Sequence, residues 1–130
     1  MDEFVSVLQP IEHAQGLPNS CYTDPVMFQI ETKQIFASDW AAIGFGFDVP
    51  VAGCVCPVNF LGIPLIVVRD RSGKIKVFEN VCRHRGMILV EEAKKLNGPI
   101  TCPYHAWAYD FDGTLRATPH VGGPDIHEHQ

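Results

Sequence analysis

Two short segments, each with one cysteine and one histidine, constrain this sequence more than any other feature. Cys82 and His84 form a C-x-H pattern, Cys102 and His105 form a C-x-x-H pattern, and 17 residues lie between His84 and Cys102. Each segment is short enough to come from a single tight loop that offers one thiolate and one imidazole to metal. The candidate occupants are a structural zinc ion and a mixed-ligand iron–sulfur cluster.

The order of the ligand types separates these candidates. Zinc sites with two cysteines and two histidines more often place both cysteines in one knuckle and both histidines in the other. Here each half mixes the two types, which favours a Rieske-type [2Fe–2S] centre, where two thiolates bind one iron and two imidazoles bind the other. We therefore predict that Cys82, His84, Cys102 and His105 bind the cluster, with zinc as the structural alternative.

The residues around these ligands resemble the Rieske signature of ring-hydroxylating oxygenase large (alpha) subunits. The signature segments are 82–86 and 102–107, and the resemblance covers about residues 22–123. Further matching segments are 22–25, 35–36 with Trp40, 64–70, 78–81 and 110–113.

Three residues qualify this resemblance. Ala106 stands where the family usually has glycine, so a methyl group can alter the packing of the cluster loop without removing a ligand. Met87 and Tyr104 stand where the Rieske proteins of respiratory complexes have cysteines that tie the two loops by a disulfide. The resemblance therefore implies a lower-potential cluster of the oxygenase kind.

The family resemblance implies both a fold and a role. The expected fold is mostly β, with three small antiparallel sheets, the cluster at the tip of two loops, and a short N-terminal helix before them. The expected role is electron transfer within a non-haem iron oxygenase, a dioxygenase or monooxygenase that hydroxylates an aromatic or other small organic substrate. A ferredoxin or flavin reductase would supply the electrons. The acceptor would be a mononuclear iron in a catalytic domain downstream of this sequence, usually in the neighbouring subunit of a trimer.

The alternative function is that of a free-standing Rieske ferredoxin, an electron carrier outside any oxygenase. Such carriers generally begin close to the first strand, whereas this chain has about 50 residues of lead-in and helix, which favours the oxygenase domain. Neither reading assigns a catalytic residue to this sequence.

Local patterns divide the chain into a lead-in segment with a helix at 1–50, the Rieske domain at 51–118 and the start of a linker at 119–130. Asp24-Pro25 is typical of an N-cap followed by a proline in the first helical turn, and predicts a helix through about Phe36. Asp112-Gly113 predicts a hairpin. The expected strands are 54–60, 64–69, 74–80, 107–111 and 114–117.

Composition narrows the possible partners and location. A formal net charge of -5 and a pI near 5.6 give no basic field for nucleic acid or an anionic membrane surface. The uncharged stretch 49–68 contains prolines and glycines that divide it into two short strands rather than one membrane span. The N-terminus has no basic region followed by an apolar run, so we expect a cytoplasmic protein.

The remaining cysteines and histidines are expected to be structural. Cys21, Cys54 and Cys56 have no matching pair to complete a metal site and are interpreted as small apolar residues. His127-Glu128-His129 has the composition of a facial triad, but a flexible polar terminus is a poor scaffold for one, so we interpret it as linker. Arg83 and Arg85 are candidates for stabilising the reduced cluster or docking an acidic partner, and Trp107 for shielding the cluster.

Overall fold

The computed structural model describes residues 4–119 and residue 121. The chain folds as two units, residues 1–42 and residues 43–130, and every strand belongs to the second unit. No helix in the described part of the chain is long and apolar enough to span a membrane. The interpretation of His127 and His129 as part of a linker concerns residues outside the described range.

The first unit contains the predicted helix. A short helix α1 (Ser20–Thr23) precedes α2 (Pro25–Glu31), and Asp24 caps α2 by accepting a hydrogen bond from the Val26 N–H at 2.8 Å. The helix was expected to run to about Phe36, and helical residues do extend that far, but the last part, η2 (Thr32–Phe36), is a π-helical turn. The N-cap prediction is therefore confirmed, while the change in winding at the end was not foreseen.

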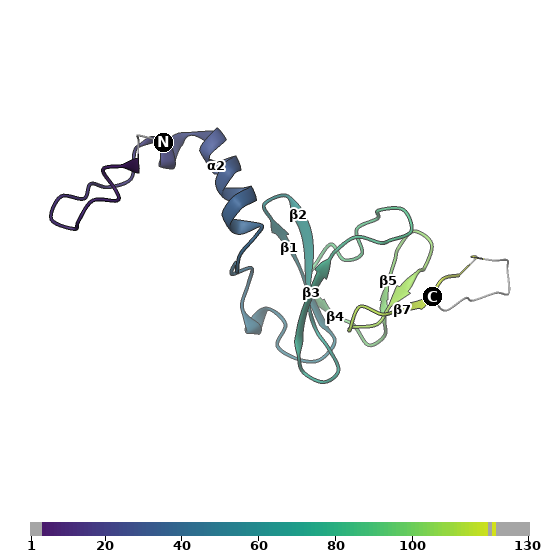
Figure 1. Ribbon diagram of the computed structural model, residues 1–130. Helices are drawn as coiled ribbons and strands as arrows, with labels where there is room; N and C mark the ends of the chain where they lie inside the picture. Colours follow the sequence, from purple (N-terminus) through teal and green to yellow (C-terminus); the bar gives the residue numbers. More distant parts are fainter. Residues whose placement is uncertain (1–3, 120, 122–130) are drawn as a thin grey trace. The chain divides into compact units, whose positions relative to one another are not determined.

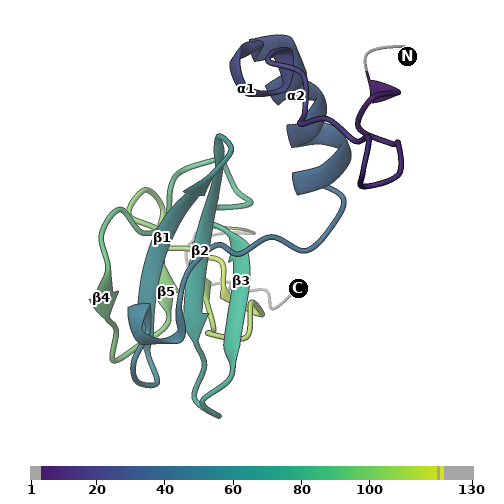
Figure 2. The same ribbon diagram turned by 90° about the vertical axis from the view of Figure 1, so that its left-hand side faces the viewer.

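The larger sheet of the second unit has four antiparallel strands in the order β3-β2-β1-β4. Figure 2 shows β1, β2 and β3 side by side, and a 3-10 turn η3 (Gly46–Asp48) precedes them. The first three strands match the expected ones within one residue at each end. Their bounds are β1 (Cys54–Phe60), β2 (Ile63–Arg69), β3 (Ile75–Glu79) and β4 (Lys94–Lys95).

The smaller sheet has three antiparallel strands in the order β5-β6-β7 and lies to one side of the larger sheet (Figure 1). These strands are β5 (Ile100–Thr101), β6 (Ala108–Tyr109) and β7 (Leu115–Ala117). The predicted Asp112-Gly113 hairpin joins β6 to β7, and Gly113 has a φ of +94° that a side chain would strain.

The mostly β class is confirmed, but the described residues form two sheets rather than the expected three. The ends of the segment that carries Cys82 meet in a single bridge, Val81 to Ile88, in place of a third ladder. Next to this bridge the Asn80 side chain makes two hydrogen bonds to the backbone of Val90, as a paired residue of a neighbouring strand would. Its amide donates to the Val90 carbonyl at 2.6 Å and its carbonyl accepts from the Val90 N–H at 3.0 Å.

The main core lies between the two sheets. Val55, Ile66 and Val68 point from the larger sheet toward Ile100 and Tyr109 of the smaller one, and all are buried. The same cluster includes Cys82 and Cys102. The two predicted metal-binding cysteines therefore sit at the edge of the core, on loops whose bases are fixed by the sheets.

Candidate metal centre at two matching loops

The two loops that carry the predicted ligands have the same backbone hydrogen bonds. In the first, the Cys82 N–H donates to the Met87 carbonyl at 2.7 Å and the Gly86 N–H donates to the Cys82 carbonyl at 2.9 Å. In the second, the Cys102 N–H donates to the Trp107 carbonyl at 2.8 Å, and the Ala106 N–H to the Cys102 carbonyl at 3.1 Å. Each cysteine thus opens a six-residue turn and is fixed by its own peptide groups.

The fifth residue of each turn has a left-handed backbone. Gly86 has a φ of +71° and Ala106 has a φ of +57°. Glycine adopts this conformation freely, whereas a residue with a Cβ is strained there. The effect of the Ala106 methyl group is therefore on the backbone of the loop, in addition to the packing change that the sequence suggested.

The four predicted ligands come together as two like pairs. Cys82 and Cys102 are 1% and 3% exposed and belong to the same buried cluster, and Cys102 is one of the groups that lower the pKa of the Cys82 thiol. The rings of His84 and His105 meet edge to face, with centroids 4.8 Å apart. Within the described residues, no three His, Cys, Asp or Glu side chains converge on one point that could hold a single ion. A dinuclear cluster needs only two protein ligands at each iron, whereas a structural zinc ion needs four at one point.

Tyr109 of β6 reaches the sulfur of Cys82. Its hydroxyl oxygen lies 3.3 Å from Cys82 Sγ and accepts a hydrogen bond from the Arg83 N–H at 3.1 Å. Because the Arg83 N–H already donates to this oxygen, the phenol hydrogen is available for the sulfur. Sequence reasoning did not select Tyr109. The signal that could have found it is a tyrosine on a buried strand, because the hydroxyl of a buried tyrosine usually needs a hydrogen-bond partner.

The pKa values of this pair agree with a thiolate that accepts from a phenol. Burial raises the pKa of the Cys82 thiol, but hydrogen bonds from the Tyr109 hydroxyl, the His84 N–H and the Cys102 thiol outweigh it and lower the pKa. Burial and the bond to Cys82 raise the pKa of Tyr109 to about 12. The pKa of the tyrosine is thus raised while that of the cysteine is lowered, which is the direction that binding of a metal by the thiolate requires.

Aromatic rings pack against both histidines. The Trp107 indole stacks on the His84 ring of the other loop, with centroids 4.8 Å apart and an interplanar angle of 8°. The Tyr104 ring lies against its neighbour His105 at 3.8 Å and 39°. The buried indole N–H of Trp107 has no hydrogen-bond partner among the described residues. Trp107 therefore packs between the loops, and its role in shielding the cluster stays a prediction.

The other cysteines lie outside this centre. Cys54 is buried in a second apolar cluster with Val49 and Val67, and Cys56 packs against that cluster. Burial and the nearby charge of Asp48 raise the pKa of the Cys56 thiol, so it remains protonated. Cys21 lies in α1 of the first unit, and all five cysteines are free thiols. Cys54 and Cys56 thus belong to a different cluster from Cys82 and Cys102 of the C-x-H and C-x-x-H segments.

A small β domain with two matching turns, each offering one thiol and one imidazole, defines a class of metal-binding electron carriers. The family model described as the Rieske [2Fe-2S] domain matches residues 39–127. The chain belongs to the Rieske [2Fe-2S] domain family, whose cofactor is a [2Fe–2S] cluster. The donor set found here, two buried thiols side by side and two adjacent imidazoles, fits that cluster.

Curated relatives place the chain with the Rieske domains of oxygenase subunits rather than with free ferredoxins. It is 38% identical over 114 residues to the glycine betaine monooxygenase oxygenase subunit of Chromohalobacter salexigens, covering 88% of this chain and 26% of that protein. It is 39% identical over 109 residues to the biphenyl 2,3-dioxygenase alpha subunit of Rhodococcus jostii, covering 83% and 24%. The chain thus spans about a quarter of the length of these relatives.

Solved structures agree with this placement. The quaternary ammonium Rieske monooxygenase CntA in complex with gamma-butyrobetaine superposes with a TM-score of 0.74 at 31% identity, covering 84% of this chain and 32% of that one. A naphthalene 1,2-dioxygenase with indole bound gives a TM-score of 0.68 at 34% identity, covering 81% and 24%.

Proposed function

We propose that Cys82 and Cys102 bind one iron of the [2Fe–2S] cluster, and that His84 and His105 bind the other. The pairing of like donors is the observation that carries this assignment. The two thiols are adjacent and buried, and the two imidazole rings lie 4.8 Å apart. This arrangement matches a cluster whose irons differ in ligand type, and each loop contributes to both irons.

The chain's own residues prepare the site for electron transfer. When bound, the cluster accepts and releases one electron at a time. Burial of Cys82 and Cys102 keeps water from the sulfur atoms, and the Tyr109 hydroxyl stabilises negative charge on Cys82. Trp107 and Tyr104 fix the planes of the two imidazoles through ring contacts. The histidines are only partly buried, so the centre lies near the surface where a partner can approach.

In the whole protein, we infer, this domain feeds electrons to the catalytic iron of an oxygenase. The oxygenase subunits among the relatives support this role, and one similar structure, a quaternary ammonium Rieske monooxygenase, is described with inter-subunit electron transfer. The proposal includes a ferredoxin or flavin reductase as donor, a catalytic domain of a neighbouring subunit in a trimer as acceptor, and a cytoplasmic location. In it, residues 51–118 form the Rieske domain and 119–130 begin the linker.

The relatives act on two kinds of substrate. The glycine betaine and carnitine enzymes have quaternary ammonium compounds in their names, and the biphenyl and benzene enzymes have aromatic hydrocarbons. Identities of 38% and 39% to the first member of each kind do not separate them. The proposal therefore commits to an oxygenase of a small organic substrate and to neither kind.

Loading the chain with iron and sulfide tests the ligand assignment. We expect about two irons and two sulfides per chain and a visible cluster spectrum. Changing any of Cys82, His84, Cys102 or His105 to alanine should abolish that spectrum, because the described residues bring no further cysteine into the cluster of Cys82 and Cys102. The matched controls are serine substitutions at Cys21, Cys54 and Cys56, which should keep it.

Two results would contradict the proposal. One is a normal cluster in the Cys82→Ala variant. The other is about three irons per chain, with hydroxylation by this chain alone that is lost on changing His127 or His129, because the tail would then be a catalytic iron site.

A further inference from the structure

The two ligand loops are hairpins with matching turns, but their bases are closed in different ways. In the second hairpin, β5 and β6 form two backbone pairs directly before Cys102 in the chain. In the first hairpin, the corresponding pairing before Cys82 is the single bridge of Val81 with Ile88. Asn80 occupies the position where a second pair would follow. The first loop is therefore closed by a side chain where the second is closed by backbone.

Asn80 connects the first loop to the larger sheet through both its backbone and its side chain, and it is only 2% exposed. Its backbone N–H donates to the Pro64 carbonyl of β2 at 2.8 Å, and its backbone carbonyl accepts from the Leu89 N–H at 3.3 Å. Its side-chain amide is hydrogen-bonded to both backbone groups of Val90, at 2.6 Å and 3.0 Å. The backbone bonds can form with any residue other than proline, whereas the bonds to Val90 require the amide.

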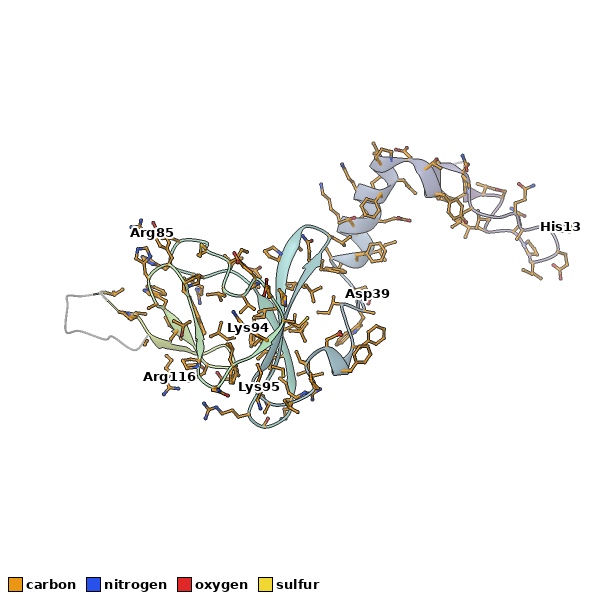
Figure 3. The ribbon with its side chains drawn as sticks, turned by 180° about the vertical axis from the view of Figure 1, so that it is seen from behind. His13, Asp39, Arg85, Lys94, Lys95 and Arg116 are labelled. Carbon is orange, nitrogen blue, oxygen red and sulfur yellow. The ribbon has the colours of Figure 1, made fainter. Side chains whose placement is uncertain are left out.

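The upper part of the first loop is held by contacts with the second loop. The Tyr109 hydroxyl accepts from the Arg83 N–H, and the Trp107 indole stacks on the His84 ring. Figure 3 shows Arg85, near the tip of the first loop, at one end of the strand unit. The base of the loop, where the chain leaves the larger sheet, therefore decides whether these contacts can form.

We propose that Asn80 is a positioning residue of the metal centre: its amide fixes the first ligand loop, and with it Cys82 and His84, in register with the second loop. This inference rests on the proposed function, since it concerns the same four ligands. Loss of the amide leaves the buried N–H and carbonyl of Val90 unpaired, which costs more free energy than the bonds themselves contribute. The loop then shifts or opens, so its two ligands sample several positions.

Hydrogen exchange, followed by mass spectrometry on the full chain, tests whether the amide holds one loop or the whole fold. In Asn80→Ala, exchange in peptides from 81–90 should become about tenfold faster, because buried backbone groups lose their partners. Exchange in peptides from 100–109 should change by no more than about twofold, since backbone pairs close that loop. The measurement is made with and without the loaded cluster, so a variant that does not load still gives a result.

A positioning role also requires a change in the cluster itself. Electron paramagnetic resonance of the reduced, loaded Asn80→Ala variant should show broader lines with shifted g values, because the ligand geometry varies from molecule to molecule. A purely structural role would leave these lines unaltered, since the ligands would return to the same positions once the cluster is bound.

Asn59→Ala is the matched control. The Asn59 side chain also accepts a hydrogen bond from a backbone N–H, that of Gly62 at 2.9 Å, but in the turn between β1 and β2. This variant should leave the exchange of both ligand loops and the resonance lines unchanged. Asn80→Asp covers the case that the alanine variant does not fold. It keeps the size and the acceptor for the Val90 N–H but loses the donor to the Val90 carbonyl, so it should change the first loop in the same direction.

The proposal is overturned if both loops exchange faster by the same factor in the Asn80 variants, which indicates a loss of global stability, or if neither loop changes more than in Asn59→Ala. Faster exchange of the first loop with unaltered resonance lines also overturns it. A variant whose first loop exchanges faster and which no longer loads supports the proposal. Failure of the unaltered chain to assemble a cluster would instead contradict the proposed function, and the missing absorption would reveal that separately.

Discussion

Tyr109 shows how a single hydroxyl can set the properties of the centre. Its hydroxyl oxygen accepts a hydrogen bond from the Arg83 N–H and lies 3.3 Å from the Cys82 sulfur, so one group orders the loop backbone and stabilises negative charge on a proposed ligand. An added electron makes the sulfur more negative, and a hydrogen bond to it is then stronger. The bond therefore favours the reduced state.

Tyr109→Phe should lower the reduction potential. A loss of about 1 kcal/mol of preferential stabilisation corresponds to about 40 mV for one electron, so we expect a fall of several tens of millivolts. Protein-film voltammetry measures the potential. Tyr104→Phe removes the same atom from a ring that contacts His105, and should leave the potential nearly unchanged. An equal fall in both variants would contradict the role given to Tyr109.

Ala106 provides a second prediction for a single residue. It has a φ of +57° at the position where the matching turn has Gly86. Ala106→Gly should raise the free energy of unfolding by up to about 1 kcal/mol, because the left-handed strain of a Cβ outweighs the extra freedom of glycine when unfolded. In the reciprocal variant, Gly86→Ala, the free energy of unfolding should fall by about the same amount. Urea unfolding measures the free energy of unfolding of both variants. A lower value for Ala106→Gly than for the unaltered chain would contradict the claim that the backbone is strained at Ala106.

At the scale of elements, the sequence predicts the structural features that are determined by residues close together in the chain. Asp24-Pro25 marks the start of α2, and Asp112-Gly113 marks the hairpin between β6 and β7, because both signals act through local backbone geometry. The spacing of Cys82 and His84 likewise indicates a ligand loop. These features could be read without knowing the tertiary structure.

Features that depend on distant contacts could not be predicted in this way. The pairing of β4 with β1 includes a bond from the Leu96 N–H to the Gly53 carbonyl at 2.9 Å, and nothing in the sequence around Lys94-Lys95 favours a strand. The bond between Tyr109 and Cys82 joins residues 27 positions apart. The number of sheets was wrong for the same reason, since it depends on which short segments meet in space.

The turn between β2 and β3 gives a prediction for pH. Asp70 Oδ1 accepts from the Ser72 hydroxyl at 2.7 Å, the Ser72 N–H at 2.8 Å and the Lys74 N–H at 2.9 Å. The Ser72 hydroxyl bond is the largest cause that lowers the pKa of Asp70 from its ordinary 3.8, in spite of partial burial. The pKa of Asp112 is lowered in the same way, and the hydrogen bond from the Thr114 N–H is the largest cause.

A carboxylate with a lowered pKa stabilises the fold above its unfolded pKa and loses that contribution as the pH falls through the folded value. The urea midpoint should therefore be flat above about pH 5 and fall below about pH 4. Asp70→Asn should lower the midpoint near neutral pH and make the fall at acid pH shallower. If the urea midpoint of this variant falls with acid pH as steeply as that of the unaltered chain, the Asp70 turn does not contribute to the acid dependence of stability.

At the scale of the whole molecule, the second unit is a scaffold that presents one centre at the ends of two loops. The sheets bury the base of each loop in a shared core, and the matching turns bring the two proposed thiol ligands into one cluster and the two proposed imidazole ligands into ring contact. The chain spans about a quarter of its oxygenase relatives. Its proposed contribution to such an enzyme is therefore a unit that receives and delivers electrons.

The central claim is that one iron has two histidine ligands from this chain. Electron–nuclear double resonance on the reduced protein, grown with 15N-labelled histidine, measures this most directly. We predict strong couplings from two nitrogen nuclei in the unaltered chain, and their loss with the cluster in the His84→Ala and His105→Ala variants. The control is the reverse labelling, with unlabelled histidine and 15N in all other nitrogen, which should show no strong 15N coupling. A cluster signal without strong histidine couplings, or with only one coupled nitrogen, would contradict the account.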